Sequence, residues 1–396
     1  MGIVYPFKAW IPSDEYVSQV AVRSSGYADN KEILSVLSEN PLSYLHAVKP
    51  YLHFGTDKKD PSLHFAHGAN YIKQMIQSGV LHQHSEETYY IYRQTSIDTG
   101  IYYQGIVGLC GVEAFNQDKV KRHEHTLPRK ENMLVEHISF TKMSGEPVLV
   151  MHDSYHDLEA VKRNITANPP VITFACEGQQ HELWIVENEE RDLLQEELDK
   201  IPMMYIADGH HRSAAAVKYI DMGKSEEKGF MTLFVDKSDL HIEPFHRLVK
   251  TDVSKLLEFL NGNNFKVTEV NSYHELEKRI RCFGFYFDNN WHQIEYTGVY
   301  FEENALDVSI IEEAFINDYC GIANSKEDNR VEFIEGSQPM YLAENRVANN
   351  EFDLLIALNS CRIEDICDIA DRNETMPPKS TYVLPKLLSG LTIQEI

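Results

Sequence analysis

Residues 207–212, with the sequence ADGHHR, bring together side chains that can hold an anion. Asp208 could hold a hydroxyl group, a histidine or a magnesium ion. Arg212 can make a two-pronged contact to a phosphate or a carboxylate. His210 and His211 lie between these two charged residues and would project toward the same point. The residue types and their spacing therefore indicate a site for a phosphorylated ligand.

The flanking residues predict a strand, a tight turn and a helix. The apolar run 203–207 suits a buried strand, and Asp208 and Gly209 end it. From His210 the sequence is rich in helix formers, with three alanines that let a helix lie close to a sheet, and Gly223 is the expected C-cap. The first turn of such a helix offers backbone N–H groups and a positive dipole end to phosphate. The predicted cofactor-binding residues here are Gly209, His210, His211, Arg212 and Ser213.

A purely structural interpretation of the same residues stays open. Asp208 could be the N-cap of the helix, the two histidines could be solvated residues of its first turn, and Arg212 could pair with a surface carboxylate. Because four such side chains converge on one helix start, we favour the functional interpretation.

A second polar stretch, KRHEHTLPRK at residues 121–130, sets a carboxylate between two histidines. His123 and His125 would share one face of an extended segment, with Glu124 on the other face. Glu124 could be the general base that takes a hydroxyl proton, the His-x-His pair could bind a transition metal, or the stretch could be a polar loop. The metal interpretation is the weakest, because the motif is short and no matching spacing recurs nearby. His123 and Arg129 are the candidates for holding a phosphorylated substrate.

The composition is that of a globular protein, and its charge restricts the partners. With 396 residues, 43% of them hydrophobic, the chain is long enough for two or three domains. The net charge of −24 opposes the phosphate backbone of nucleic acids, so we expect no nucleic-acid partner. A small anionic ligand remains compatible, because a local cationic pocket can outweigh a diffuse charge that is screened within about 10 Å at 0.1 M salt.

The sequence also predicts a cytoplasmic protein with no membrane partner. The N-terminus MGIVYPFKAWIP lacks the pattern of a signal peptide. No apolar run approaches the roughly 20 residues that a membrane span needs. The six cysteines are scattered without a CxxC pair, so neither a disulfide framework nor a zinc site is expected.

The alternation of strands and helices predicts an α/β fold with a mixed (α+β) sheet in two domains. Residues 1–250 hold the central turn, and residues 251–396 read as a second, C-terminal α/β domain. Three glycines spaced every third residue near 105–111 do not form a GxGxxG that opens onto a helix, which excludes a Rossmann fold. The expected elements include a strand over 5–10, an edge strand over 240–246, and helices over 66–78, 273–280 and 305–319.

The string ADGHHR resembles the phosphate-binding turn of the ParB and sulfiredoxin superfamily, in which a G-x-H/R-R turn at a helix start holds nucleotide phosphates. Its DGHH variant looks most like the turn of free serine kinases. The whole chain is similar to the bacterial domain of unknown function 1015 family, through PFKAW from residue 6, NPLSYLH from residue 40, ADGHHR, and MPPKSTYVLPKLLSG from residue 376. This resemblance implies a ParB/sulfiredoxin-like nucleotide-binding core, with residues 1–250 as the catalytic domain and its N-terminal extension.

The resemblance also brings two further segments toward the ligand. NPLSYLH belongs to the family signature, so His46 could contact the substrate, although a helix start capped by Asn40 or Ser43 is an equal alternative. Lys379 in the tail could close over phosphate, although a strand that ends in solvated lysines is equally compatible.

These observations predict a phosphotransferase that uses ATP or ADP with Mg²⁺ on a small hydroxylated amino acid such as free serine. Phosphoryl transfer needs an anion cradle, magnesium to neutralise charge, and a carboxylate to orient the attacking hydroxyl. The cradle would be residues 209–212, with His210 also catalytic, Asp208 a metal ligand or catalytic group, and Glu124 the favoured base. A phosphoserine phosphatase and a nucleotide-gated binding module without turnover are the alternatives. A homo-oligomer is left open.

Overall fold

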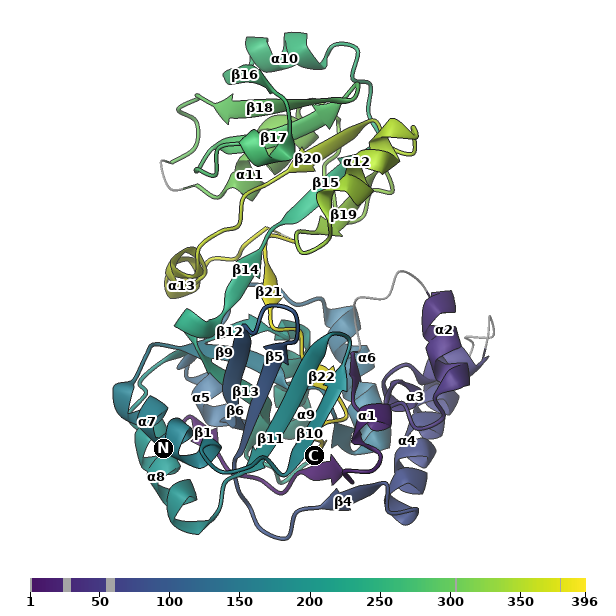
Figure 1. The fold of residues 1–396 in the computed structure, drawn as a ribbon, viewed down its shortest axis with the longest axis vertical. Coiled ribbons are helices and arrows are strands. Elements are labelled where there is room, and N and C mark those ends of the chain that lie inside the picture. The colour runs from purple at the N-terminus through teal and green to yellow at the C-terminus, as the bar shows by residue number, and fades with distance from the viewer. Residues whose placement is uncertain (1, 24–29, 55–60, 303–304, 378) are drawn as a thin grey trace. The chain divides into compact units, whose positions relative to one another are not determined.

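The computed structural model describes residues 2–23, 30–54, 61–302, 305–377 and 379–396. The chain divides into two compact units, of which unit 1 comprises Met1–Leu240 and Pro385–Ile396, and unit 2 comprises His241–Leu384 (Figure 1). The sequence places the boundary after residue 250 and gives the whole tail to the second domain, and the observed units differ from this in both places. That the unit holding the central turn is the catalytic one stays a prediction.

Unit 1 is built on a mixed sheet of nine strands. Its strands are β1 (Val4–Tyr5), β5 (Tyr90–Ser96), β6 (Tyr102–Gly111), β7 (Val120–Lys121), β9 (Val148–His152), β10 (Ile172–Cys176), β11 (Gln179–Ile185), β12 (Met204–Asp208) and β13 (Gly229–Asp236). Eight of them follow the order β10-β11-β5-β6-β13-β9-β12-β7, and β1 pairs with β6. The pairs β13–β9 and β12–β7 are parallel, and the other pairs are antiparallel. The predicted α/β class with a mixed sheet is confirmed.

The helices of unit 1 lie around this sheet (Figure 1). They are α1 (Val17–Val20), α2 (Asn30–Glu39), α3 (Leu45–Val48), α4 (Pro61–Gln77), α5 (Val112–Asn116), α6 (Pro128–Thr141), α7 (His156–Thr166), α8 (Asn188–Leu198) and α9 (His210–Asp221), with 3₁₀ turns η1 (Pro50–Phe54) and η2 (Lys237–Asp239). Figure 1 shows α7 and α8 on the opposite side of unit 1 from α2, α3 and α4. The alanines of α9 do what the sequence suggests, because Ala215 and Ala216 are buried in the main core. Helix α9 also packs against α6.

The C-terminal tail is an integral part of unit 1. Short ribbons pair β22 (Leu388–Ser389) with β3 (Val22–Arg23), and β23 (Gln394–Glu395) with β8 (Met143–Ser144). A third ribbon joins β2 (Trp10–Pro12) and β4 (Leu81–Gln83). Ile396 is buried in the main core. The amide of Gln394 accepts from Met231 N at 2.8 Å and donates to Gly229 O at 2.8 Å. Buried apolar and hydrogen-bonded groups therefore hold the tail against β13.

Three expectations for unit 1 are corrected at prolines. The strand expected over 5–10 is two strands, because Pro6 has no N–H for a ladder and β1 ends before it. The helix expected from residue 66 begins at Pro61. The polar stretch up to residue 130 is only partly extended, because helix α6 begins at Pro128. Proline is favoured at the first helical position, where its missing N–H would have no partner. Arg129 therefore lies in a helix rather than in an extended loop.

Unit 2 is built on six antiparallel strands in the order β16-β18-β17-β20-β15-β19. These are β15 (Phe245–Val249), β16 (Phe265–Val270), β17 (Cys282–Phe287), β18 (Asn290–Tyr296), β19 (Val331–Glu335) and β20 (Leu354–Ala357). A separate ribbon pairs β14 (His241–Glu243) with β21 (Tyr382–Leu384). The helical elements are α10 (Leu256–Gly262), η3 (Tyr273–Glu275), α11 (Asp307–Ile311), the π-helical η4 (Glu312–Asn317), α12 (Met340–Ala348) and α13 (Ile363–Asp371).

The sequence was least informative in unit 2. The edge strand expected over 240–246, with an interruption at Pro244, is two strands of different sheets. Strand β14 pairs with β21, whereas β15 lies between β20 and β19 and is therefore not an edge strand. The helix expected over 273–280 is a single 3₁₀ turn. The helix expected over 305–319 begins at Asp307 and changes to π-helical geometry at Glu312.

Candidate functional site

The predicted strand, turn and helix are present in the middle of unit 1. Strand β12 ends at Asp208, and α9 begins at His210. Gly209 between them is the N-cap and has φ +99°, in the left-handed region that favours glycine. A Cβ at this position would also lie 3.0 Å from Nη2 of Arg212. The turn therefore favours glycine at position 209 for two reasons, the positive φ and the nearby arginine. The N-cap is Gly209, so Asp208 is not the N-cap that the structural alternative required.

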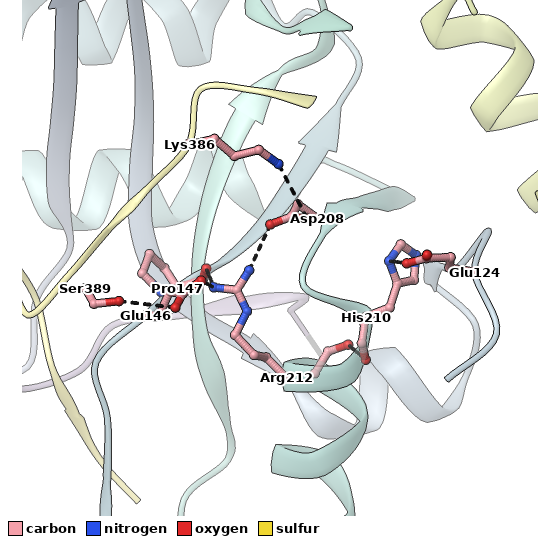
Figure 2. A network of polar contacts seen from close by, with 9 residues as sticks. Glu124, Glu146, Pro147, Asp208, His210, Arg212, Lys386 and Ser389 are labelled. Atoms are coloured by element: carbon pink, nitrogen blue, oxygen red, sulfur yellow. Dashed lines mark hydrogen bonds and ion pairs between the residues drawn. The ribbon is translucent and has the colours of Figure 1, made fainter. Parts of the chain in front are cut away.

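Arg212 is held in place by two carboxylates. Its Nη2 donates to Asp208 Oδ2 at 2.9 Å, and its Nη1 donates to the carboxylate of Glu146 and to Pro147 O, the latter at 3.0 Å (Figure 2). The structural alternative, an arginine paired with carboxylates, thus describes these contacts. However, the arginine side chain is only 21% exposed. The fork is therefore fixed beside the first turn of α9 by Asp208, Glu146 and Pro147.

The C-terminal tail supplies the other half of this network. Lys386 Nζ lies 3.9 Å from Asp208 Oδ1, and Ser389 Oγ donates to Glu146 Oε2 at 3.1 Å (Figure 2). The network thus joins two carboxylates to two cationic side chains, so its formal charges cancel. Sequence reasoning missed Glu146 and Ser389, and it favoured a different lysine of the tail. The only signal for Lys386 was the family resemblance of the tail.

Tyr44, from the NPLSYLH segment, packs against the same network. A Cβ on Gly145 would lie 2.2 Å from the Tyr44 ring, and one on Gly390 would lie 2.6 Å from Tyr44 Cβ. Gly390 N donates to Gly145 O at 2.8 Å. Segments near residues 44, 145, 209 and 390 therefore meet in one place.

Glu124 faces the first residue of α9. The ring of His210 is 3% exposed, and its Nδ1 lies 3.4 Å from Glu124 Oε2. Burial, together with the nearby His123, lowers the pKa of His210 well below its ordinary value, so the imidazole is neutral. Its Nε2 accepts from His123 N at 3.4 Å, which leaves the proton on Nδ1, directed at the carboxylate. Glu124 itself is 38% exposed and can be reached by a substrate.

His123 is the least satisfied polar group near this point. Its side chain is 3% exposed, and its ring meets that of His210 edge to face at 4.4 Å. Burial lowers the pKa of His123 to about 4, although the charge of Asp208 opposes this. Among the described residues, its Nδ1 has no partner with hydrogen-bond geometry. A buried polar atom without a partner costs stability and therefore requires a specific explanation.

His211 holds the Glu124 loop in place. Its Nε2 accepts from Leu127 N at 3.1 Å. With the bond from His123 N to His210, this fixes both ends of residues 123–127 on the start of α9. The two adjacent histidines therefore tie the loop that carries the carboxylate to the turn that carries the N–H groups. This role was not apparent from the sequence.

The remaining predicted residues have their own local contacts. Ser213 is fully buried, and its hydroxyl donates to His210 O at 2.9 Å. His46 contacts His53 Nε2 at 2.9 Å and Asn40 O at 3.1 Å through its ring nitrogens. Lys379 belongs to unit 2, where its Nζ lies 4.4 Å from the centre of the Phe245 ring. Arg129 is exposed. The ligand contacts assigned to these residues stay predictions.

The carboxylates near the start of α9 could supply only part of the ligand set of a magnesium ion. Within the described ranges, no group of three or more His, Cys, Asp or Glu side chains could hold a metal. Mg²⁺ is commonly bound by one or two carboxylates, with water and phosphate oxygens completing its octahedron. Asp208 is 46% exposed at the cradle and fits that lesser role. The six cysteines are free and give no zinc site.

The fold is that of an α/β protein in which strand β12 leads through a left-handed glycine turn into helix α9. The chain matches the family described as "Protein of unknown function (DUF1015)" over residues 4–309, and it belongs to that family. No curated protein matches it. Along the described residues, no helix has the length and apolar character that crossing a membrane requires.

Several solved structures are similar to this chain. A free serine kinase in complex with AMP is 16% identical, with a TM-score of 0.36, over 68% of this chain and 86% of that one. A conserved hypothetical protein from Pyrococcus furiosus is 17% identical, with a TM-score of 0.36, over 70% and 92%. SbnI with a C-terminal truncation, from Staphylococcus aureus, is 14% identical, with a TM-score of 0.38, over 70% and 82%.

Proposed function

We propose that this protein is a nucleotide-dependent phosphotransferase that transfers a phosphoryl group to the hydroxyl of a small amino acid such as free serine. The observation that carries the proposal is the start of α9. There, the left-handed Gly209 turn and the fixed fork of Arg212 adjoin a half-exposed Glu124 that faces neutral His210 at 3.4 Å. An anion cradle and a candidate base thus share one helix turn.

The cradle would bind the nucleotide phosphates. The first N–H groups of α9 point out of the helix, and its dipole adds a positive potential there. Arg212 can contact two phosphate oxygens, and Lys386 adds a second positive charge within the same network. Asp208 would supply one carboxylate ligand to magnesium, which, when bound, neutralises charge on the transferring phosphate.

Glu124 would act on the substrate. The hydroxyl oxygen attacks the terminal phosphorus and forms a new P–O bond, while the P–O bond to the leaving nucleotide breaks. The hydroxyl proton passes to the Glu124 carboxylate. His210 positions that carboxylate through the proton on Nδ1, and its neutral ring adds no competing positive charge. His210 thus acts through Glu124.

Phosphorus NMR tests this proposal directly. The full-length protein is incubated with ATP or ADP, magnesium and serine, and a parallel sample contains phosphoserine alone. We expect a phosphoserine resonance to grow as the nucleotide loses its terminal phosphate. Release of inorganic phosphate from phosphoserine alone would instead identify a phosphatase. If nucleotide binds but all resonances persist, the protein is a binding module and the proposed transfer is wrong.

A further inference from the structure

A small apolar cavity opens beside the Arg212 network in unit 1. Its volume is about 130 Å³, and both Arg212 and Glu146 line it. The rest of its wall is mostly apolar and comes from segments that include α4, α6 and the residues around α3. Its aromatic and aliphatic lining includes the side chains of Tyr44, Tyr51, Phe65, Met133, Leu134 and Ile138. The cavity therefore continues the polar network into an apolar space.

The size and lining of this cavity suit one ring of a base, and the remaining atoms of a purine would lie toward exposed Met133 in its wall. Protein interiors are close-packed, and they contain few voids larger than a water molecule. An apolar cavity of about 150 Å³ is large enough to bind benzene. The aromatic rings of Tyr44 and Phe65 offer stacking or edge contacts to such a group. Tyr44 is also held rigidly, because the adjacent Gly145 and Gly390 leave no room for a Cβ.

We propose that this cavity takes the base of the nucleotide whose phosphates bind at the start of α9. The inference rests on the proposed function, and it names the surface that recognises the base and the sugar of the nucleotide. Arg212 belongs to both places, because it lines the cavity and lies beside the first turn of α9. Glu146 lines the cavity too, and a carboxylate there can accept from ribose hydroxyls. The phosphate would thus lie at the start of α9, the base in the cavity, and the sugar between them beside Arg212.

The base contribution is measured by comparing AMP with ribose 5-phosphate. Both carry one phosphate on a ribose, and only AMP carries a base. Binding of each to the full-length protein is followed by competition against ATP. We expect AMP to bind at least tenfold more tightly than ribose 5-phosphate. Equal affinities would overturn the inference while leaving the phosphate cradle intact.

Two substitutions on α6 test whether the base lies in the cavity. Met133 and Leu134 line it, and Met133 is 54% exposed, so tryptophan at either position fills the space without opening the core. Met133→Trp and Leu134→Trp should each weaken AMP binding at least fivefold and leave ribose 5-phosphate unchanged. Met222→Trp is the matched control, because Met222 is 53% exposed and lies at the other end of α9. Thermal melting checks that each variant is folded.

The outcomes separate the two proposals. If ATP binds but both α6 variants bind AMP like the wild type, the base lies elsewhere and only the cavity assignment is wrong. The same conclusion follows if the variants weaken AMP and ribose 5-phosphate equally. If the wild-type protein binds neither ATP nor AMP, the proposed function itself fails, and the base site fails with it.

Discussion

Unit 1 contains two polar clusters that differ in how water reaches them. The Arg212 network at the start of α9 is partly exposed, with side-chain exposures of 21% for Arg212 and 46% for Asp208, and it adjoins a cavity. The second cluster lies where the parallel strands β9 and β13 end, at the paired residues His152 and Asp236. Its lysine, Lys162, is 1% exposed.

The charged groups of the second cluster have close partners, although among the described residues its His152 Nε2 has none. Lys162 pairs with Glu159 one turn earlier on α7. Burial raises the pKa of Asp236, but the hydrogen bonds from Ser154 and Ser238 outweigh this effect and hold the pKa below its ordinary value. A charge that is this buried and paired is costly to disturb and difficult for a ligand to reach. The comparison therefore separates the clusters by access: a ligand can reach the partly exposed Arg212 network beside its cavity, whereas Lys162 is closed off.

The largest expected effect is on turnover. Glu124→Gln keeps the shape of the side chain but removes the proton acceptor, so turnover should fall about 10²- to 10⁴-fold with a nearly unchanged KM. Steady-state kinetics with serine as acceptor measure it. Glu189→Gln, at an exposed position in the first turn of α8, is the control. It should keep turnover within about twofold, because Glu189 is not among the residues proposed to contact substrate or nucleotide.

A companion variant separates the two carboxylates of the site. Asp208→Asn should raise the magnesium concentration needed for half-maximal rate, because Asp208 is the proposed metal ligand. Glu124→Gln should leave that concentration unchanged. Full activity of Glu124→Gln, together with an inactive Asp208→Asn whose metal dependence is normal, would make Asp208 the base.

The next effect is on the free energy of unfolding, and here the larger loss is expected from the buried cluster and the smaller one from the Arg212 network. Lys162→Ala removes a buried stem and leaves Glu159 without its partner, so the free energy of unfolding should fall by about 3 kcal/mol. Lys386→Ala should cost less than about 1 kcal/mol, because its ion pair with the half-exposed Asp208 is loose at 3.9 Å. Urea unfolding measures both. Equal losses would show that exposure does not distinguish these clusters.

Acid should destabilise the protein through His123. The ring stays neutral in the folded state down to about pH 4, whereas an unfolded histidine binds a proton below about pH 6.5. Stability from this group is therefore complete above the unfolded pKa and is lost as the pH falls toward 4. We expect a loss of about 2 kcal/mol between pH 7 and pH 5. His123→Gln should lessen it in urea unfolding, whereas His156→Gln on exposed His156 should retain it.

The smallest expected effect concerns the geometry of one cation. Arg212→Lys keeps the charge but loses the fork, so nucleotide affinity should fall about tenfold, which corresponds to about 1.4 kcal/mol. Calorimetry with ADP measures it, and Arg163→Lys on exposed α7 serves as the control. A variant with wild-type affinity would mean that the Arg212 fork only binds Asp208 and Glu146.

The sequence predicted what is local and missed what is brought together by the fold. The β12 strand, the Gly209 turn and α9 follow from apolar runs, a breaker and helix formers within twenty residues or so, so periodicity was enough. Glu146 and Ser389 reach Arg212 only through tertiary pairing. In the same way, the role of His211 in holding Leu127 depends on α6 beginning at Pro128. No spacing rule gives such contacts.

The central claim is that the start of α9 binds phosphate groups, and ligand-dependent unfolding tests it most directly. ADP at 100 times its dissociation constant should raise the free energy of unfolding by about 2.7 kcal/mol, whereas adenosine at the same concentration should raise it much less. Chemical unfolding of the full-length protein with each ligand gives both values. The predicted result is a preference for ADP whose stabilisation falls to about 1.4 kcal/mol in Arg212→Lys at the same ADP concentration, because its affinity is tenfold lower. If adenosine stabilises the protein as much as ADP, the turn at residues 209–212 is not a phosphate site.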